Sequence, residues 1–248
     1  MILKFAFRAE GAALKLPKSY NRLLQAFFYK NMDEQIATFL HDRGYELGKR
    51  KFKLFTFSKI FGKFLKKDNE FVYYKPTFRI YFASPKNEVS ISTLRKMLLE
   101  NKDLFLGENK LQLLNVEAIT LEEIPEEVEV KTLSPIVVYK TEPGSRFFNY
   151  LTPQDEEFYR LLRENLKRKY MLVYGRPFEG NIEIEPVKVS ERDFKKVVFK
   201  GTLIKAWGGI YKIKAPKEMI NLAFETGLGA KNSAGFGMVL PVEVKIYK

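Results

Sequence analysis

The amino-acid sequence predicts an α+β fold of two tandem ferredoxin-like (RRM-like) domains, each with the element order β-α-β-β-α-β. Alternating and helical hydrophobic spacings follow one another along the chain, and the same order of elements occurs twice. An acidic, proline-containing stretch at residues 122–127 separates the two occurrences and differs in charge from the basic segments on either side. We therefore place the domains at residues 1–124 and 125–248.

The first half opens with a half-buried strand, because Leu3, Phe5 and Phe7 alternate with smaller or charged neighbours. Apolar residues at three-to-four spacing then predict a helix around residues 23–28 and a second from about residue 33, which Gly44 ends. The remaining elements expected in this half are strands at residues 51–57, 71–75 and 78–83, a helix at 90–100 and a strand at 111–119.

The second half begins with an expected strand at residues 128–139. Thr152, Pro153 and Asp155 then indicate a helix start, with a hydroxyl N-cap, proline at the first helical position and an acid in the first turn. That helix is expected to bury Phe158, Leu161, Leu162 and Leu166. The remaining elements are strands at residues 182–189, 196–206 and 209–214, a helix at 217–226 and a strand at 239–247.

The charge balance indicates a polyanionic partner. Among 248 residues, 43 Lys and Arg face 30 Asp and Glu, and the resulting net charge of +13 attracts nucleic acid above all. A membrane surface is the competing partner, but no apolar run approaches the ~20 residues that span a bilayer, and the N-terminus lacks a signal core. We therefore expect a soluble, cytoplasmic protein without a membrane partner. The absence of cysteine excludes disulfides, thiolate metal sites and cysteine nucleophiles.

A glycine segment at residues 227–237 combines two Gly-hydrophobic-Gly pairs with a polar, basic centre. Glycine permits a positive φ or close backbone approach to a ligand, and the central side chains offer donors to phosphate oxygens. It matches neither the dinucleotide fingerprint nor the phosphate-loop motif. The predicted RNA-binding residues of the segment are Gly227, Gly229, Lys231, Asn232, Ser233, Gly235 and Gly237. An ordinary glycine-rich turn before the last strand is the alternative.

His41 is the only histidine of the chain, so any imidazole acid-base catalysis depends on it. An imidazole can accept and donate a proton near neutral pH, which suits cleavage of RNA by its own 2′-hydroxyl group. If the chain folds back at residues 31–33, Tyr29 and His41 face one site, although a tyrosine is a poor base unless its environment lowers its pKa. A cation is also needed to stabilise the phosphorane, and Lys53 is our first choice, ahead of Lys51, Lys30 and Arg43.

The segment from Arg43 to Lys67 carries nine basic residues and a single acid, Glu46, interleaved with phenylalanines. Basic residues interspersed with aromatic ones suit phosphate contact and base stacking, and we include Lys51 and Arg43 among the candidate RNA-binding residues. A solvated strand edge with its apolar face in the core is the alternative. No clustered acidic motif indicates a metal-dependent nuclease, so we expect neither a metal nor another cofactor.

Several motifs, in the same order, resemble the CRISPR-associated endoribonucleases that process repeat precursor RNA, within the wider repeat-associated RNA-binding (RAMP) superfamily. The resemblance extends over nearly the whole chain. The segments that carry it are LPKSYNRLLQ at residues 16–25, Tyr29, FLHDRGY at 39–45, FKLFTFS at 52–58, LSPI at 133–136 and the glycine segment.

This resemblance implies two ferredoxin-like domains and metal-independent cleavage within the repeat, leaving a 5′-hydroxyl and a 2′,3′-cyclic phosphate. By position, His41 matches the general acid of the family, Tyr29 the proton acceptor and Lys53 the transition-state stabiliser. Because the partners of the histidine vary within the family, Lys30 or Tyr45 are the alternatives. CRISPR repeat RNA is the implied partner, with other CRISPR effector-complex proteins and a homodimer as further options.

Two other functions are compatible with the sequence. One is a non-catalytic module that binds repeat RNA, since some relatives lack the histidine. The other is a ribosome- or RNP-associated structural protein of the same fold. Cleavage of the RNA separates both from the endoribonuclease, and a preference for repeat RNA separates them from each other.

Overall fold

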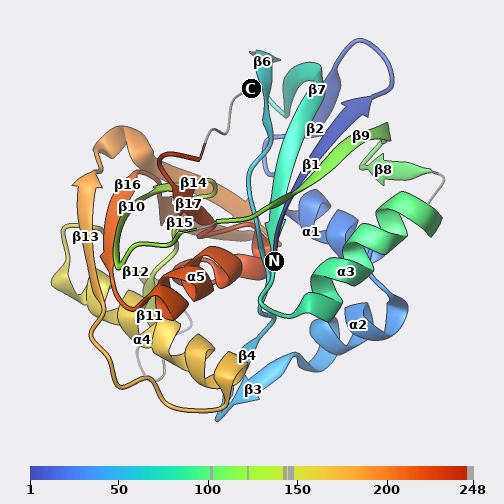
Figure 1. Ribbon diagram of the computed structural model, residues 1–248. Coiled ribbons are helices and arrows are strands. Elements are labelled where there is room, and N and C mark those ends of the chain that lie inside the picture. Colours follow the sequence, from blue (N-terminus) through green and yellow to red (C-terminus); the bar gives the residue numbers. More distant parts are fainter. Residues whose placement is uncertain (101–102, 122, 142–143, 145–147, 245–248) are drawn as a thin grey trace.

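Two antiparallel sheets with helices packed on them make up the computed structural model, which describes residues 1–100, 103–121, 123–141, 144 and 148–244 (Figure 1). Strands of the first sheet lie between residues 2 and 119, and strands of the second between 127 and 241. Each sheet is built on the ferredoxin-like order, which confirms the predicted α+β fold class.

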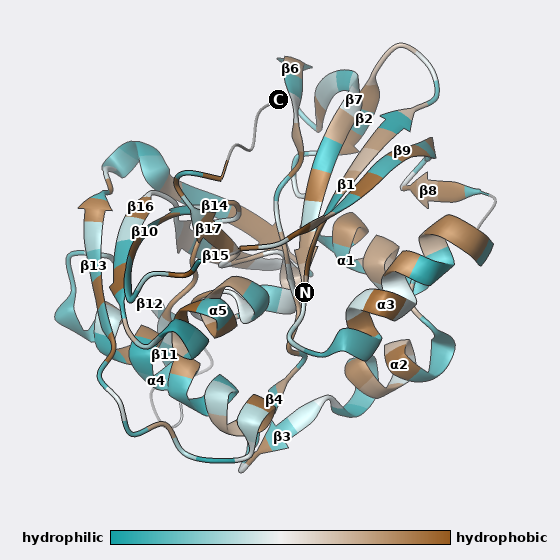
Figure 2. Cartoon of the chain, viewed as in Figure 1, coloured by the Kyte–Doolittle hydropathy of each residue, from teal (hydrophilic) through white to brown (hydrophobic). Residues whose placement is uncertain are grey.

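The first sheet is centred on β1 (Ile2–Ala9), which pairs with β7 on one edge and with β9 on the other. Along β1, buried and more exposed side chains alternate from Leu3 onward. Figure 2 shows hydrophobic and hydrophilic residues interspersed along the strands of this sheet. The path β2-β7-β1-β9-β8 consists of β2 (Leu14–Pro17), β7 (Phe71–Ala83), β9 (Asn109–Ile119) and β8 (Leu104–Leu106), while β5 (Thr56–Phe57) and β6 (Phe61–Lys67) pair with the other edge of β7.

Helices of the first half bury their apolar residues against this sheet. Phe28 of α1 contacts Phe5, Phe57 and Phe82, with ring centroids 4.7 to 6.4 Å apart. The elements are α1 (Asn21–Lys30), α2 (Glu34–Thr38) with a following π-helical turn (Phe39–Arg43), the hairpin of β3 (Tyr45–Leu47) and β4 (Arg50–Phe52), and α3 (Asn87–Arg95) with a π-helical turn (Lys96–Glu100).

The second sheet has the order β13-β16-β10-β17, so its second, third, first and fourth strands lie side by side. This is the strand order of a ferredoxin-like domain. One helix connects the first strand to the second, and another connects the third strand to the fourth. The elements are β10 (Glu127–Thr132), α4 (Glu156–Tyr174), β13 (Glu183–Lys188), β16 (Ile210–Lys214), α5 (Lys217–Thr226) and β17 (Val239–Pro241). Two hairpins of this half form separate two-stranded sheets, β11 (Tyr139–Thr141) with β12 (Phe148–Tyr150), and β14 (Phe194–Phe199) with β15 (Thr202–Trp207).

The two halves share a hydrophobic core. Ile2, Phe61 and Tyr81 of the first sheet belong to the same buried cluster as Phe158 of α4 and Phe224 of α5. Burial of this cluster stabilises the two halves against each other. A domain boundary between residues 124 and 125 stays a prediction.

Some predicted element boundaries are wrong. The expected strand at 51–57 is broken because Leu54 has a φ of 51°, and the expected strand at 128–139 ends at Thr132. The fourth helix begins at Glu156, since the Asp155 carboxylate accepts hydrogen bonds from the backbone N–H and hydroxyl group of Thr152 and caps a preceding turn. β17 ends at Pro241, and residues 245–248 of the expected last strand lie outside the described residues.

Candidate active site and basic cleft

The π-helical turn Phe39–Arg43 presents His41 at the surface. Leu40 is fully buried and anchors the turn, while the His41 side chain is 70% exposed. The turn ends at Gly44, whose N–H donates to the Phe39 carbonyl at 2.7 Å and whose φ is 68°. A Cβ at this position would meet the Phe52 carbonyl oxygen at 2.6 Å, so the glycine lets the strand that precedes Lys53 approach His41.

The three predicted catalytic residues lie together. The ring centroids of Tyr29 and His41 are 5.9 Å apart, edge to face, which the predicted reversal of the chain at residues 31–33 explains. Lys53 Nζ donates a hydrogen bond of 2.8 Å to the His41 carbonyl oxygen. His41 Nδ1 lies 2.7 Å from Asp42 Oδ1, so Asp42 orients the ring and Nε2 is the nitrogen left for a substrate.

Tyr29 lies in a drier environment than His41. Its ring packs edge-on against Phe55, at a centroid distance of 5.6 Å, and burial raises the pKa of Tyr29 to about 12. A phenol with this pKa carries its proton at neutral pH. The environment therefore favours Tyr29 as a hydrogen-bond donor over Tyr29 as a proton acceptor.

Lys53 is a half-buried cation. Burial lowers its pKa from the ordinary value, the neighbouring charge of Lys51 lowers it further, and the Asp42 carboxylate opposes both effects. Lys53 connects the turn that carries His41 with a neighbouring cleft, described below. Its Nζ binds the His41 backbone, and its side chain lines that cleft.

The alternative partners of His41 are engaged elsewhere or point to solvent. Lys51 forms an ion pair of 3.4 Å with Glu46 across the β3–β4 hairpin. The Tyr45 hydroxyl group donates to Glu88 at 3.3 Å, and burial is the main cause that raises the pKa of Tyr45 to about 12. Lys30 and Arg43 are exposed. Among these candidates, Lys53 alone has a described contact with His41.

A cleft of about 640 Å³ opens beside Lys53, between β4, the β11–β12 hairpin, α4 and the glycine segment. No aspartate or glutamate belongs to the described residues that line it. The lining cations are Arg50, Lys51, Lys53, Lys140, Arg168, Lys169 and Lys231. Such a lining concentrates positive potential and suits a phosphate-bearing ligand.

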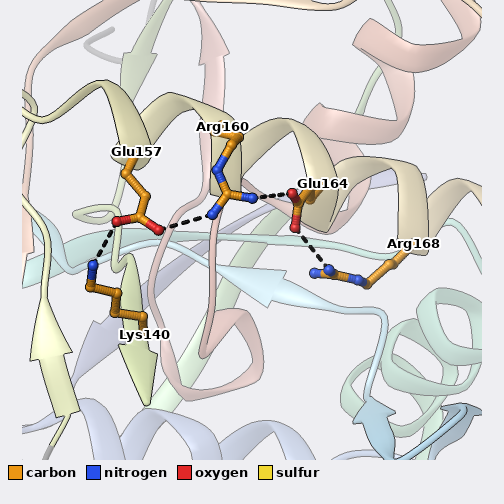
Figure 3. A network of polar contacts seen from close by, with 5 residues as sticks. All are labelled: Lys140, Glu157, Arg160, Glu164 and Arg168. Atoms are coloured by element: carbon orange, nitrogen blue, oxygen red, sulfur yellow. Dashed lines mark hydrogen bonds and ion pairs between the residues drawn. The ribbon is translucent and has the colours of Figure 1, made fainter. Parts of the chain in front are cut away.

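Two of these cations are held by a chain of ion pairs along α4 (Figure 3). Glu157 binds Lys140 at 2.7 Å and Arg160 at 2.9 Å, Arg160 also binds Glu164, and Glu164 binds Arg168 at 2.9 Å. Exposed ion pairs of this kind add little to stability. Their effect is positional, because they hold Lys140 and Arg168 in the lining of the cleft.

The glycine segment packs mainly against the protein itself. All four of its predicted RNA-binding glycines, Gly227, Gly229, Gly235 and Gly237, are buried and have a positive φ. A Cβ on Gly229 would meet the Val137 carbonyl oxygen at 2.4 Å. Packing alone therefore accounts for these glycines, as in the alternative of a glycine-rich turn, and their contact with RNA stays a prediction.

Side chains of α1, in the first half of the chain, form hydrogen bonds with the backbone of the glycine segment. Gln25 Nε2 donates to the Ser233 carbonyl oxygen at 2.7 Å, and Asn21 Nδ2 donates to those of Ala234 and Gly235 at 3.0 and 3.2 Å. These bonds join residues more than 200 positions apart in the sequence. They place the polar centre of the segment on the same side of the molecule as α1.

Lys231, at the polar centre of the glycine segment, has an unusual backbone conformation and lies over two aromatic rings. Its φ of 61° is rare for a residue with a side chain, and its Nζ lies 5.4 Å from the Tyr139 ring centroid and 5.0 Å from that of Phe148. Burial lowers the pKa of Lys231. Lys231 thus lines the same cleft as Lys53.

Three of the lining cations, Lys140, Arg168 and Lys169, lie outside the segments that the sequence analysis singled out for RNA binding. The signal for Lys169 was present, because it falls on the apolar stripe of α4 next to Leu166 and Tyr170, where a charged residue is out of place. For Lys140 and Arg168 the sequence holds no comparable signal, since surface helices and hairpins commonly carry such residues.

The described residues provide neither a metal-binding cluster nor a membrane-spanning helix. Within this part of the chain, no group of three or more His, Asp or Glu side chains is arranged to hold a metal ion. None of the helices found there combines the length and apolar character that crossing a bilayer requires.

The chain resembles known proteins over most of its length. The family model of CRISPR associated protein Cas6, C-terminal, matches residues 119–240. A CRISPR-associated endoribonuclease Cas6 of Methanocaldococcus jannaschii is 30% identical over 205 residues, which cover 80% of this chain and 78% of the relative. The Cas6 endoribonuclease of Pyrococcus furiosus is 26% identical over 235 residues, or 92% of this chain and 84% of the relative.

The fold agrees with these sequence matches. A solved structure of a CRISPR associated protein Cas6 superposes with a TM-score of 0.79 at 25% identity and covers 98% of this chain and 99% of its own. The resemblance that the motifs indicate is thereby confirmed by sequence and by structure. The protein belongs to the Cas6 family of CRISPR-associated endoribonucleases.

Proposed function

We propose that this protein cleaves CRISPR precursor RNA within the repeat to give crRNA. The observation that carries the proposal is the position of His41, exposed, oriented by Asp42 and joined through Lys53 to a cleft lined by cations and by no described acid. The family relatives are named as CRISPR-associated endoribonucleases, which supports the class of substrate and the reaction. Repeat RNA is accordingly the proposed partner.

The proposed reaction is attack by the 2′-hydroxyl group on the adjacent phosphorus. The O2′–P bond forms, the proton of the 2′-hydroxyl group passes to a solvent water molecule, the P–O5′ bond breaks, and the products are a 2′,3′-cyclic phosphate and a 5′-hydroxyl. His41 donates a proton from Nε2 to the leaving 5′-oxygen, while its Nδ1 stays bound to Asp42. Lys53 stabilises the negative charge of the phosphorane from the cleft side.

We assign Tyr29 to the 2′-hydroxyl side of the same reaction, because its ring adjoins that of His41. The raised pKa keeps its phenol protonated, so we propose that Tyr29 orients the 2′-oxygen by hydrogen bonding, with a general base role as the alternative. No step requires a metal ion. A cytoplasmic location, association with other CRISPR proteins and homodimer formation stay predictions from the sequence.

Product analysis in excess EDTA tests the proposed reaction. The wild-type protein is incubated with its repeat RNA, and the termini of the fragments are identified by their response to phosphatase and kinase treatment. We expect one cut in the repeat, a 2′,3′-cyclic phosphate on the upstream fragment and a 5′-hydroxyl on the downstream one. RNA that is bound but stays intact in EDTA would favour the non-catalytic binding module or a metal requirement.

Replacing Tyr29 by phenylalanine separates its two roles. Loss of one orienting hydrogen bond costs about tenfold in the single-turnover rate, whereas loss of a proton acceptor costs on the order of 100-fold or more. We expect the smaller loss, because burial holds the phenol in its protonated form. A 100-fold loss, together with a rate that rises with pH only in the wild type, would identify Tyr29 as the general base.

A further inference from the structure

Lys169 is a buried lysine whose contacts all lie in or next to the glycine segment. It belongs to α4, and only 2% of its surface is exposed. Its Nζ donates to the Gly227 carbonyl oxygen at 2.7 Å and to Asn232 Oδ1 at 2.8 Å, with the Thr226 and Gly229 carbonyl oxygens at 3.4 Å. These four acceptors come from the last residue of α5 and from the first six residues of the glycine segment.

The acceptors of Lys169 are neutral oxygens, which makes its protonation state sensitive to its surroundings. Burial lowers the pKa of Lys169 to about 7, so the ammonium and amine forms lie close in free energy at neutral pH. An ammonium group offers three N–H donors to four acceptors, and an amine offers only two. The ammonium form therefore holds the segment more firmly.

The contact with Asn232 extends this hold across the whole segment. Asn232 Nδ2 donates to the carbonyl oxygens of Leu228 and Phe236, at 3.0 Å each. These two bonds connect the beginning of the glycine segment with its end. Lys231 precedes Asn232 directly and lies over the aromatic rings of the β11–β12 hairpin. The position of the Lys231 ammonium in the cleft thus depends on the bonds that Lys169 makes.

The charges that face Lys169 across the cleft are all positive among the described lining residues. Arg168 comes from its own helix, and Lys231 from the glycine segment. The other elements that line the cleft contribute Arg50, Lys51, Lys53 and Lys140. A polyanion placed among these groups neutralises their field and favours the charged form of Lys169, and linkage then requires that protonation strengthens binding of the polyanion.

We propose that Lys169 is a positioning residue for RNA recognition, whose protonated form fixes the glycine segment in the cleft, so that RNA binding is accompanied by proton uptake at Lys169. This inference rests on the proposed function. It adds a buried positioning residue and a direction for the pH dependence of binding.

The test measures affinity for repeat RNA from pH 6 to pH 8.5 by fluorescence anisotropy, at constant ionic strength and in a His41→Ala background. That background prevents cleavage and removes the only histidine. If RNA raises the pKa of Lys169 by one unit, affinity falls by about sevenfold over this range. Calorimetry in two buffers of different ionisation enthalpy reports the accompanying proton uptake near pH 7.

Two substitutions and a matched control assign the pH dependence. Lys169→Met removes the titrating group, and Lys169→Arg keeps a charge that does not titrate, so both are expected to flatten the profile. Lys131 is the control, because its Nζ donates to neutral carbonyl oxygens, those of Val242 and Val244, but it does not line the cleft. Lys131→Met is expected to keep the pH dependence of the parent protein.

The outcomes separate this inference from the proposed function. A profile that stays equally steep in folded Lys169→Met or Lys169→Arg protein overturns the role of Lys169 and leaves the endoribonuclease proposal intact. If Lys169→Met does not fold, as thermal unfolding will show, Lys169→Arg and the calorimetric proton count decide. Failure of the parent protein to bind repeat RNA at any pH overturns both proposals.

Discussion

Replacing His41 by alanine is expected to abolish cleavage of repeat RNA while binding stays close to that of the wild type. One positioned proton transfer contributes on the order of 100- to 10,000-fold to a rate. The side chain is 70% exposed and its described polar contact is with Asp42, so its removal leaves the packing of the turn intact. Single-turnover cleavage rates and anisotropy titrations of the same preparation measure the two quantities.

A neighbouring substitution controls for general disturbance of this region. Gln35 is exposed on α2, directly before the turn that carries His41. Gln35→Ala is therefore expected to cleave and bind like the wild type. Normal cleavage by His41→Ala would remove the histidine from the mechanism.

Gly237→Ala is expected to destabilise the protein more than any other glycine substitution in the glycine segment. A Cβ at Gly237 would lie 1.9 Å from the Leu228 carbonyl oxygen, and the Leu228 N–H donates to the Gly237 carbonyl at 2.7 Å. The backbone at Leu228 and the backbone at Gly237 cannot move apart without breaking this hydrogen bond. Backbone strain at a φ of 74° and overpacking together lower the free energy of unfolding by about 3 to 5 kcal/mol.

Gly48→Ala provides the comparison for Gly237→Ala. Gly48 has a φ of 57°, similar in sign, but no atom lies within 4 Å of its expected Cβ. Its substitution carries the conformational cost alone, about 1 to 2 kcal/mol. Chemical denaturation of both variants measures the difference. Equal losses would mean that the Gly237 contact relaxes freely and that the segment is not a packed element.

Local patterns predicted those parts of the fold that depend on neighbours in the sequence. The helix at residues 217–226 has the predicted bounds, because Pro216 precedes it, Gly227 ends it and its apolar residues keep a helical spacing. The meeting of Tyr29 and His41 also follows from local signals, namely two short helical segments and a reversal between them.

Features set by distant contacts were not predictable. β6 was not recognised, because most of its residues are exposed on both faces and no alternation remains to identify a strand. Lys169 carries a charge that ordinarily indicates a surface residue, and its acceptors lie 57 or more positions away. The break at Leu54 requires a positive φ that its residue type does not suggest.

In the candidate site too, local sequence patterns predicted some features, while others depend on distant contacts. Residue types and spacing identified His41, Tyr29 and Lys53, and the structure adds that Lys53 binds the backbone of His41 itself. The glycine segment was recognised by its composition, while its attachment to α1 and to Lys169 depends on the tertiary fold. The sequence therefore indicates candidate residues for the chemistry, and the fold determines how they are held.

The most direct test of the central claim is cleavage of a repeat RNA in which sulfur replaces the 5′-oxygen of the leaving group. A thiolate leaves without protonation, because thiols are far more acidic than alcohols. If His41 protonates the 5′-oxygen, His41→Ala protein will cleave the sulfur-containing RNA at close to the wild-type rate while it fails on ordinary RNA. Equal failure of His41→Ala on both substrates would contradict the assignment of His41 as the general acid.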